Sequence, residues 1–180
     1  MTTITKDTTL KELAGIVGAA LSDAGIDAVL IGGAAVSIYT DNVYQTYDLD
    51  FMIAQVRPKA IAKALEPIGF KREGMGRHFS HPDTEFLVEF PTEELNFGET
   101  NASLESVNIL STPRGNVRVI TPTQSVMDRM AAYVHWKDRQ SHNQAIAIIR
   151  DNPIEWEQLY EWAARESVDS GIIDDLKLEK

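Results

Sequence analysis

The chain has 180 residues, 43% of them hydrophobic and 24% charged, a length that suits one well-cored domain and hardly two independent enzymes. Its formal net charge of −10 argues against a protein that coats nucleic acid, because such binding depends on Lys and Arg neutralising phosphates. There is no cysteine, no signal-peptide pattern at the N-terminus and no apolar run near the roughly 20 residues of a membrane span, so we expect a cytoplasmic protein without disulfides or a membrane partner.

The first 53 residues predict a helix, a strand, a second helix and a second strand. Apolar residues recur at helical spacing from Leu10 to Leu21, with Thr8 or Thr9 as the cap and Gly25 at the stop. The segment "DAVLIGG" then predicts a short buried strand that meets a glycine turn, and "AAVSIY" predicts the first turns of a helix. The segment "TYDLDFMI" predicts the next strand.

The middle of the chain predicts a third helix followed by short strands. The helix starts at Pro58 and stops at Gly69, and "FKREG", "RHFSH" and "EFLVEF" then have the pattern of short strands with polar turns between them. Alternation around "TPRGN" predicts a hairpin, and "TPTQ" predicts a capping box with Thr121 as the helix cap.

Everything from Pro122 onward has helical periodicity, with breaks near residues 137–141, 152–153 and 169–171. The predicted fold class is therefore α+β: a small mixed β-sheet with flanking helices, followed by a C-terminal helical region. We place the α/β core at residues 1–121 and the helical region, packed on that core, at residues 122–180.

Two aspartates stand inside the second predicted strand. Side chains alternate along a strand, so Asp48, Asp50 and Met52 share one face while Leu49, Phe51 and Ile53 point into a core. Asp48 and Asp50 lie roughly 6.5–7 Å apart along the strand. From that separation two carboxylates can converge on Mg²⁺ or Mn²⁺, both of which prefer hard oxygen ligands. The alternative is a sheet edge with an acidic outer face.

Gly32 and Gly33 stand between a buried strand and a predicted helix start. Glycine lets the backbone approach a ligand, and a helix start offers free N–H groups at its positive end, which together favour a phosphate site. A tight turn or close helix packing explains an isolated Gly-Gly equally well. Glu89, in "EFLVEF", is a third carboxylate that reaches the aspartates if the two strands are neighbours.

This order of motifs resembles the signature of the nucleotidyltransferase superfamily with the DNA polymerase β-like catalytic fold. The residues that carry the resemblance are Ile31-Gly32-Gly33, Asp48-Leu49-Asp50 and Glu89, and it extends over roughly residues 27–140. It looks closest to the minimal bacterial branch that includes abortive-infection and toxin–antitoxin nucleotidyltransferases, in which the helical part carries a Lys-Asp pair like Lys137-Asp138.

The resemblance implies a site and a reaction. Asp48, Asp50 and Glu89 would be catalytic and would hold two Mg²⁺ (or Mn²⁺) ions, while Gly32 and Gly33 cradle the phosphates of a nucleoside triphosphate. The family often has Ser where this chain has Gly33, and Ser37, one helical turn later, is the candidate to replace it. The candidate cations that would neutralise the phosphate tail are Arg72, Arg77 and Lys137.

The implied function is transfer of a nucleoside monophosphate from an NTP to a hydroxyl of RNA, protein or a small molecule, with release of pyrophosphate. A tRNA or protein acceptor and a cognate antitoxin are possible partners, and the chain would then be the toxin or defence enzyme of a two-gene system. The alternative is a catalytically inactive module that keeps the fold for binding or regulation.

Other conspicuous residues allow two interpretations. Residues 113–150 hold six Lys or Arg against two Asp, which suits either a bound polyphosphate or docked RNA, or ordinary solvated helix faces. His78 and His81 fit a polar loop better than a metal site, because no cysteine accompanies them. The tryptophans Trp136, Trp156 and Trp162 fit core packing or a partner face better than a base-stacking platform.

Overall fold

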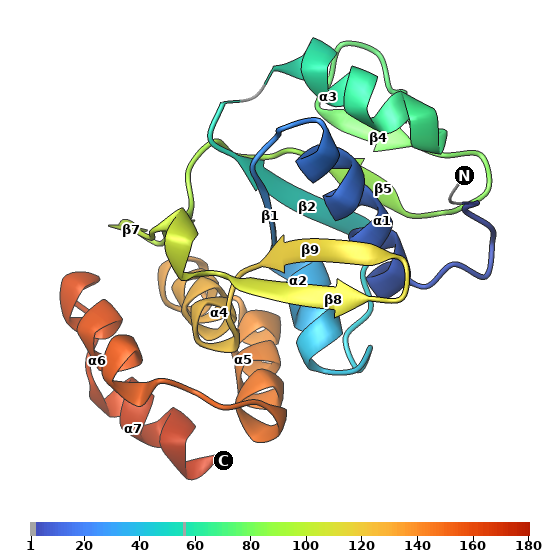
Figure 1. The fold of residues 1–180 in the computed structure, drawn as a ribbon. Helices are drawn as coiled ribbons and strands as arrows, with labels where there is room; N and C mark the ends of the chain where they lie inside the picture. Colours follow the sequence, from blue (N-terminus) through green and yellow to red (C-terminus); the bar gives the residue numbers. More distant parts are fainter. Residues whose placement is uncertain (1–2, 56) are drawn as a thin grey trace.

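The computed structural model describes residues 3–55 and 57–180, and within them a mixed sheet precedes a group of helices (Figure 1). The helices are α1 (Leu10–Asp23), α2 (Gly32–Tyr39), α3 (Pro58–Leu65), α4 (Pro122–Trp136), α5 (Arg139–Asp151), α6 (Trp156–Arg165) and α7 (Gly171–Leu178), with 3-10 turns η1 (Glu66–Ile68) and η2 (Leu104–Ser106). The strands are β1 (Ala28–Ile31), β2 (Asp48–Ile53), β3 (Lys71–Arg72), β4 (His78–Ser80), β5 (Leu87–Glu89), β6 (Asn96–Phe97), β7 (Thr100–Asn101), β8 (Asn108–Thr112) and β9 (Gly115–Val119). The α+β class and the mixed sheet predicted from the sequence are confirmed.

The described part of the sheet has seven strands in the order β3-β4-β5-β2-β1-β9-β8. The central strand β2 pairs with β1 antiparallel and with β5 parallel. At the edges, β4 pairs antiparallel with β5, and the predicted hairpin of β8 and β9 joins the sheet through β1. The strand that carries Asp48 and Asp50 therefore lies in the middle of the sheet, not at its edge.

Local signals in the sequence fix the ends of the helices. Thr9 and Glu12 form a reciprocal capping box at α1, and Gly25, with φ of 71°, follows the helix end. A second capping box, between Thr121 and Gln124, starts α4 as predicted. Both helix starts were therefore correctly predicted from short motifs.

Helix α1 packs on β1, β8, β9 and α3, and the odd-numbered residues of β2 are buried in the core. Leu49 and Phe51 are fully buried there, beside Val88 and Phe90 of β5 and its flank. Met52, which shares the face of the two aspartates, is buried as well. It lines a cavity with Leu95 and Leu104, since the chain after β5 folds back over this end of β2.

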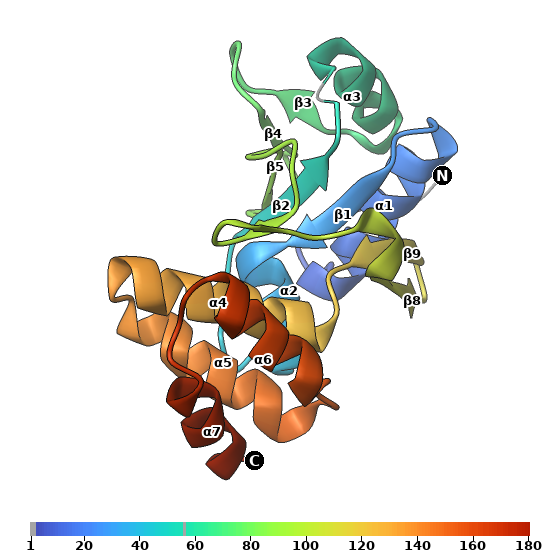
Figure 2. The ribbon, with the colours of Figure 1, turned by 90° about the vertical axis from the view of Figure 1, so that its left-hand side faces the viewer.

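The C-terminal helices lie below the sheet in both views (Figure 1, Figure 2). Helix α4 packs against α2, α5 and α6, and Asn152 Nδ2 at the end of α5 donates to the backbone oxygen of Tyr39 in α2 at 2.8 Å. The division into a core up to residue 121 and a helical region after it stays a prediction. In the described residues no helix combines the length and the apolar character needed to cross a membrane.

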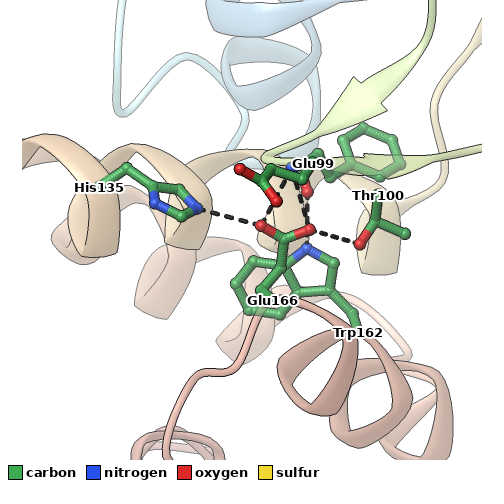
Figure 3. Close-up of polar contacts among 6 residues, drawn as sticks. Glu99, Thr100, His135, Trp162 and Glu166 are labelled. Atoms are coloured by element: carbon green, nitrogen blue, oxygen red, sulfur yellow. Dashed lines mark hydrogen bonds and ion pairs between the residues drawn. The ribbon is translucent and has the colours of Figure 1, made fainter.

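The short hairpin β6–β7, which was not predicted, is fastened to the C-terminal helices by the carboxylate of Glu166 (Figure 3). This side chain is only 1% exposed and accepts hydrogen bonds from the backbone N–H of Glu99 at 3.0 Å, from the hydroxyl of Thr100 and from His135 Nε2 at 3.1 Å. Beside it, Trp162 Nε1 donates to the backbone oxygen of Phe97 at 2.8 Å. Trp162 is thus a core residue, as expected for most of the tryptophans.

Candidate active site

Strand register brings two of the three predicted catalytic carboxylates side by side. In the parallel pair β2–β5, Asp48 is opposite Leu87 and Asp50 is opposite Glu89. Directly opposed residues on neighbouring strands point to the same face of the sheet, so Asp50 and Glu89 share a face with Asp48 two residues away. All three are partly buried, and none belongs to the apolar core.

Asp50 is the carboxylate on which the electrostatics of this face converge. Burial, followed by the negative charges of Glu89, Asp48 and Asp128, raises the pKa of Asp50 from its usual value of 3.8 to about 6, against a smaller opposing effect of Arg129. Like charges that lie close together disfavour ionisation of the group between them. The site therefore concentrates negative charge that the chain itself does not neutralise.

The contribution of α4 was not predicted from the sequence. Arg129 donates to the Asp128 carboxylate at 2.6 Å and to Gln144 Oε1 of α5 at 3.3 Å, and both charges of this pair act on Asp50. The signal available in the sequence was an Asp-Arg pair on the first half of a helix, which resembles an ordinary solvated face. Only the docking of α4 next to α2 brings the pair to the site.

His78 also belongs to the site, although we had favoured a polar loop for it. Its Nδ1 lies 2.7 Å from Glu89 Oε1, and the antiparallel pairing of β4 with β5 sets His78 directly opposite Glu89. The ring is partly exposed and orients the carboxylate from the outer side. His81, by contrast, packs against Phe70 with the two rings tilted by 54° and accepts a hydrogen bond from Asp83 N, so it is a loop residue as expected.

The glycines of the predicted phosphate motif lie against the same carboxylates. Gly32 has φ of 61°, and a Cβ added to it would lie 2.9 Å from Asp50 Oδ2. A Cβ on Gly33 would lie 3.3 Å from Thr46 Oγ1. The backbone at the start of α2 therefore approaches Asp50 more closely than any residue with a side chain permits.

Ser37, the predicted substitute for the family serine, is 1% exposed. Its hydroxyl donates to Asn42 Oδ1 at 2.9 Å and so fastens the loop that follows α2. The structure instead places the hydroxyl of Thr46 next to Gly33. Thr46 Oγ1 also accepts the N–H of Asp48 at 3.3 Å, which joins the glycine turn to strand β2.

The three predicted phosphate cations have other partners or lie at the periphery. Arg72 donates to the backbone oxygens of Gly76 and Met75, and so closes the turn between β3 and β4. Arg77 pairs with Glu93 at 3.3 Å. Lys137 is exposed at the end of α4, in the left-handed conformation with φ of 58°. The structure does not bring these three together with Asp50, and their role in nucleotide binding stays a prediction.

The predicted metal ligands have the right chemistry for Mg²⁺ or Mn²⁺, since Asp48, Asp50 and Glu89 supply hard carboxylate oxygens on one face. Within residues 3–55 and 57–180, no three His, Cys, Asp or Glu side chains already stand together as a complete ligand set. The mutual electrostatic effect on Asp50 nevertheless shows that the carboxylates are close enough to interact.

The positions of the cavities do not identify this site. Two cavities of about 410 Å³ lie at the far end of β1, both lined by Gly25, Ile26 and Asp27, and neither includes a carboxylate of β2 or β5. The candidate site is therefore identified by charge and strand register and not by a cavity.

Comparison with known proteins supports the fold. No protein-family model and no curated protein matches the sequence. Among solved structures, an antigenic nucleotidyltransferase-like protein from Paracoccidioides brasiliensis is similar, with a TM-score of 0.59 and 19% identity over 81% of this chain and 78% of that one. The antibiotic-resistance factor ANT(2'')-Ia matches with a TM-score of 0.44 and 13% identity over 93% of this chain and 86% of that one. The first likeness shows that this chain has the fold of a nucleotidyltransferase-like protein.

Proposed function

We propose that this protein is a divalent-cation-dependent nucleotidyltransferase, which moves a nucleoside monophosphate from an NTP to a hydroxyl acceptor and releases pyrophosphate. The observation that carries the proposal is that Asp50 lies next to both a second carboxylate and a glycine at a helix start. This carboxylate stands opposite Glu89 in the parallel pair β2–β5 and next to the positive-φ Gly32 that starts α2. A salt-bridge role does not account for it, because the nearest charges raise its pKa instead of lowering it.

The residues of the chain have distinct tasks in this reaction. Backbone N–H groups at the start of α2 would bind the phosphate tail, since Gly32 and Gly33 leave them accessible at the positive end of the helix. Asp48 and Asp50 would hold the divalent cations Mg²⁺ or Mn²⁺, with Glu89 as the third ligand. His78 would keep Glu89 oriented through the 2.7 Å hydrogen bond.

Bound divalent cations would supply charge stabilisation for the attacking and leaving oxygens. The acceptor hydroxyl oxygen forms a bond to the α-phosphorus while the bond from that phosphorus to the bridging oxygen breaks. The hydroxyl proton passes to a carboxylate oxygen, which we assign to Glu89, the carboxylate that His78 contacts. The β- and γ-phosphates depart as pyrophosphate.

The direct test is a transfer reaction with unselected acceptors. Purified protein would be incubated with each of the four α-labelled NTPs, with Mg²⁺ or with EDTA, and with total RNA or a protein extract. We expect label to appear in one acceptor class only when Mg²⁺ is present. Binding of every NTP without transfer to any acceptor would instead favour the inactive binding or regulatory module.

A role as the toxin or defence enzyme of a two-gene system, with a tRNA or protein acceptor and a cognate antitoxin, is a narrower form of the same proposal. Nothing in the geometry distinguishes it from a free-standing transferase. Growth arrest on expression of the parent, absent with an inactive Asp50 variant, is the result that this narrower form requires.

A further inference from the structure

The two edges of the seven-stranded sheet differ in how they are protected from another chain. One edge is β3, which has only two residues, Lys71 and Arg72, and Arg72 closes the adjoining turn. The other edge is β8, which runs for five residues, Asn108–Thr112, without a charge or a proline. Proteins commonly use short strands and basic side chains to stop an edge from pairing with another strand. Strand β8 has neither feature, so it can serve as a template for a further strand.

The hairpin register identifies which backbone groups of β8 face outward. Thr112 and Gly115 form the closing pair of the two-residue turn, and bonded and non-bonded pairs alternate from there along an antiparallel ladder. The N–H of Ile120 bonds β1, which by the same alternation leaves the odd-numbered residues of β9 for β8. Ile109 and Ser111 therefore direct their N–H and C=O groups away from the sheet.

These outward groups have no partner in the part of the chain that the structure describes. There β8 pairs with β9 alone, and no other backbone hydrogen bond involves Ile109 or Ser111. Both side chains are exposed, and Ile109 is 69% exposed although it is a large apolar residue in a regular strand. Figure 1 and Figure 2 show β8 at the outer border of the sheet. A row of free backbone donors and acceptors fits an extended strand as its occupant.

The outward residues are spaced so that two copies of β8 satisfy each other. When two identical strands run antiparallel about a two-fold axis at Leu110, Ile109 of each copy is opposite Ser111 of the other. Each such pair exchanges two N–H···O bonds, so the outward groups of both residues find partners. The two Ile109 side chains become diagonal neighbours on one face, which removes apolar surface from water.

Charges at the two ends of β8 favour the antiparallel arrangement. The turn after the strand carries Arg114, whose guanidinium donates to the backbone oxygen of Thr3, and η2 before the strand carries the exposed Glu105. Antiparallel pairing brings the turn of each copy to the η2 end of the other copy. Opposite charges therefore meet at both ends of the paired strands, whereas parallel pairing would bring like charges together.

We propose that this protein forms a two-fold homodimer, in which two β8 strands pair antiparallel about Leu110 and join the sheets of both copies. The inference does not rest on the proposed function, because β9 and β1 separate β8 from the strand of the candidate site. A five-residue edge buries less than the roughly 800 Å² per partner of a standard interface, so the dimer is weak and depends on concentration. Each copy has a net charge of −10, so added salt strengthens the dimer by screening repulsion.

Sedimentation equilibrium of the full chain, from about 5 to about 500 µM, measures the dimer Kd. Ser111→Pro removes the outward N–H and leaves the β8–β9 bonds in place, since proline is tolerated where a strand's N–H faces away from the sheet. Ser111→Ala is the matched control, because it removes the same hydroxyl and keeps the N–H. We expect Ser111→Pro to raise the dimer Kd about ten- to hundredfold, since the two-fold axis doubles the loss, and Ser111→Ala to stay within about twofold of the parent.

Ile109→Lys keeps every backbone group and covers the case in which proline disturbs the hairpin. It sets like charges at diagonal positions across the axis, so it should also raise the dimer Kd, at a Tm equal to that of the parent. Hydrogen exchange tests the register. The amides of Ile109 and Ser111 should exchange more slowly as the protein concentration rises, while that of Leu110, already bonded to β9, should not change.

Three results would overturn the dimer. The first is a parent chain that sediments as a monomer at every concentration, which would leave the edge for another protein or for solvent. The second is a dimer of the same Kd in Ser111→Pro and Ser111→Ala. The third is a dimer in which concentration-dependent protection appears at other amides and not at Ile109 and Ser111.

Discussion

Two partly or fully buried carboxylates, Asp50 and Glu166, have opposite surroundings. Glu166 is enclosed by donors, namely the N–H of Glu99, the hydroxyl of Thr100 and a ring nitrogen of His135 (Figure 3). Burial by itself would raise the pKa of Glu166, but these hydrogen bonds outweigh burial and hold it below the usual value of 4.5. Asp50 is surrounded mainly by other carboxylates, and its pKa is raised to about 6.

The contrast separates a carboxylate that the fold supplies with hydrogen-bond donors from one that it surrounds with like charges. A carboxylate that the fold uses for its own stability is supplied with donors, because an unpaired buried charge is expensive. The chain does not supply Asp50 with such donors, so ionisation of Asp50 makes the folded state less stable. An arrangement that costs stability and is completed by an external cation is the pattern expected of a binding or catalytic site.

The largest effect is expected for Asp50→Asn. The substitution keeps the size of the side chain and removes one negative charge from the proposed ligand set, and phosphoryl transfer depends almost wholly on positioning and charge stabilisation. We expect transfer activity to fall by about three orders of magnitude or more, while Tm in EDTA stays level or rises. Activity and Tm would be measured on the same preparations, and a mutant that melts markedly lower would assign Asp50 to the structural class of Glu166.

Gly32→Ala tests how closely the backbone must approach Asp50, with Gly25→Ala as its matched control. Both glycines have positive φ, 61° and 71°, so alanine introduces similar backbone strain of about 1 kcal/mol at each. Only at Gly32 does the new Cβ meet an atom, Asp50 Oδ2 at 2.9 Å, whereas nothing lies within 4 Å at Gly25. Displacement of a catalytic group by about 1 Å can cost a hundredfold in rate, so we expect a loss of about that size for Gly32→Ala and almost none for Gly25→Ala.

Equal activities of the two alanine variants, at equal Tm, would show that Asp50 tolerates displacement and that the glycine serves only the turn. Chemical denaturation gives the stability side of this comparison. The two free energies of unfolding should agree within about 1 kcal/mol, because the strained backbone conformation is the same.

Glu166→Ala tests how much the hydrogen bonds of Glu166 contribute to the stability of the fold. It leaves the N–H of Glu99 and the part-buried hydroxyl of Thr100 without their acceptor, and an unsatisfied buried polar group costs about 1–3 kcal/mol. We expect the free energy of unfolding to fall by about 2 kcal/mol, measured by urea denaturation, with kcat changed far less than by Asp50→Asn. Glu161→Ala on the same helix is the control, since that carboxylate is exposed and has only a distant partner, Arg165, at 3.9 Å.

The sequence predicted the carboxylates and glycines more completely than their surroundings. Asp48, Asp50, Gly32 and Gly33 lie within one short stretch, so local alternation and turn chemistry were enough to place them. To place Glu89 beside the aspartates, we had to assume that its strand is a neighbour of theirs. The β2–β5 pairing confirms that assumption. His78 and Asp128 were missed because their proximity depends on long-range pairing and on the docking of α4, and no local pattern encodes either.

The contacts of the predicted phosphate cations were not predicted either. Turn carbonyls engage Arg72 and Glu93 engages Arg77, while the role of both residues in nucleotide binding stays a prediction. The burial of Met52 was not predicted for a related reason. Alternation gives the side of the strand correctly, but it does not reveal that the later segment around Leu95 covers that side.

The smallest effect expected is on the pH dependence of stability, and it has opposite signs at the two carboxylates. For Asp50 the folded pKa of about 6 exceeds the usual 3.8, so the folded state binds the proton more tightly than the unfolded state. Stability from this group is fully present below about pH 4 and is lost as the pH rises through 6. For Glu166 the folded pKa is below 4.5, so its contribution is present above pH 4.5 and is lost as the pH falls through the folded pKa.

Subtracting the profile of each neutral variant from that of the parent isolates these contributions. In EDTA, the stability of the parent relative to Asp50→Asn should decrease by about 1–2 kcal/mol between pH 4 and pH 7, after allowance for the solvent that screens a partly exposed group. The stability of the parent relative to Glu166→Gln should instead increase from pH 3 to pH 5 and then stay level. A rise with pH in both difference profiles would contradict the opposite pKa shifts of the two carboxylates. It would mean that hydrogen-bond donors stabilise ionised Asp50 as they stabilise Glu166.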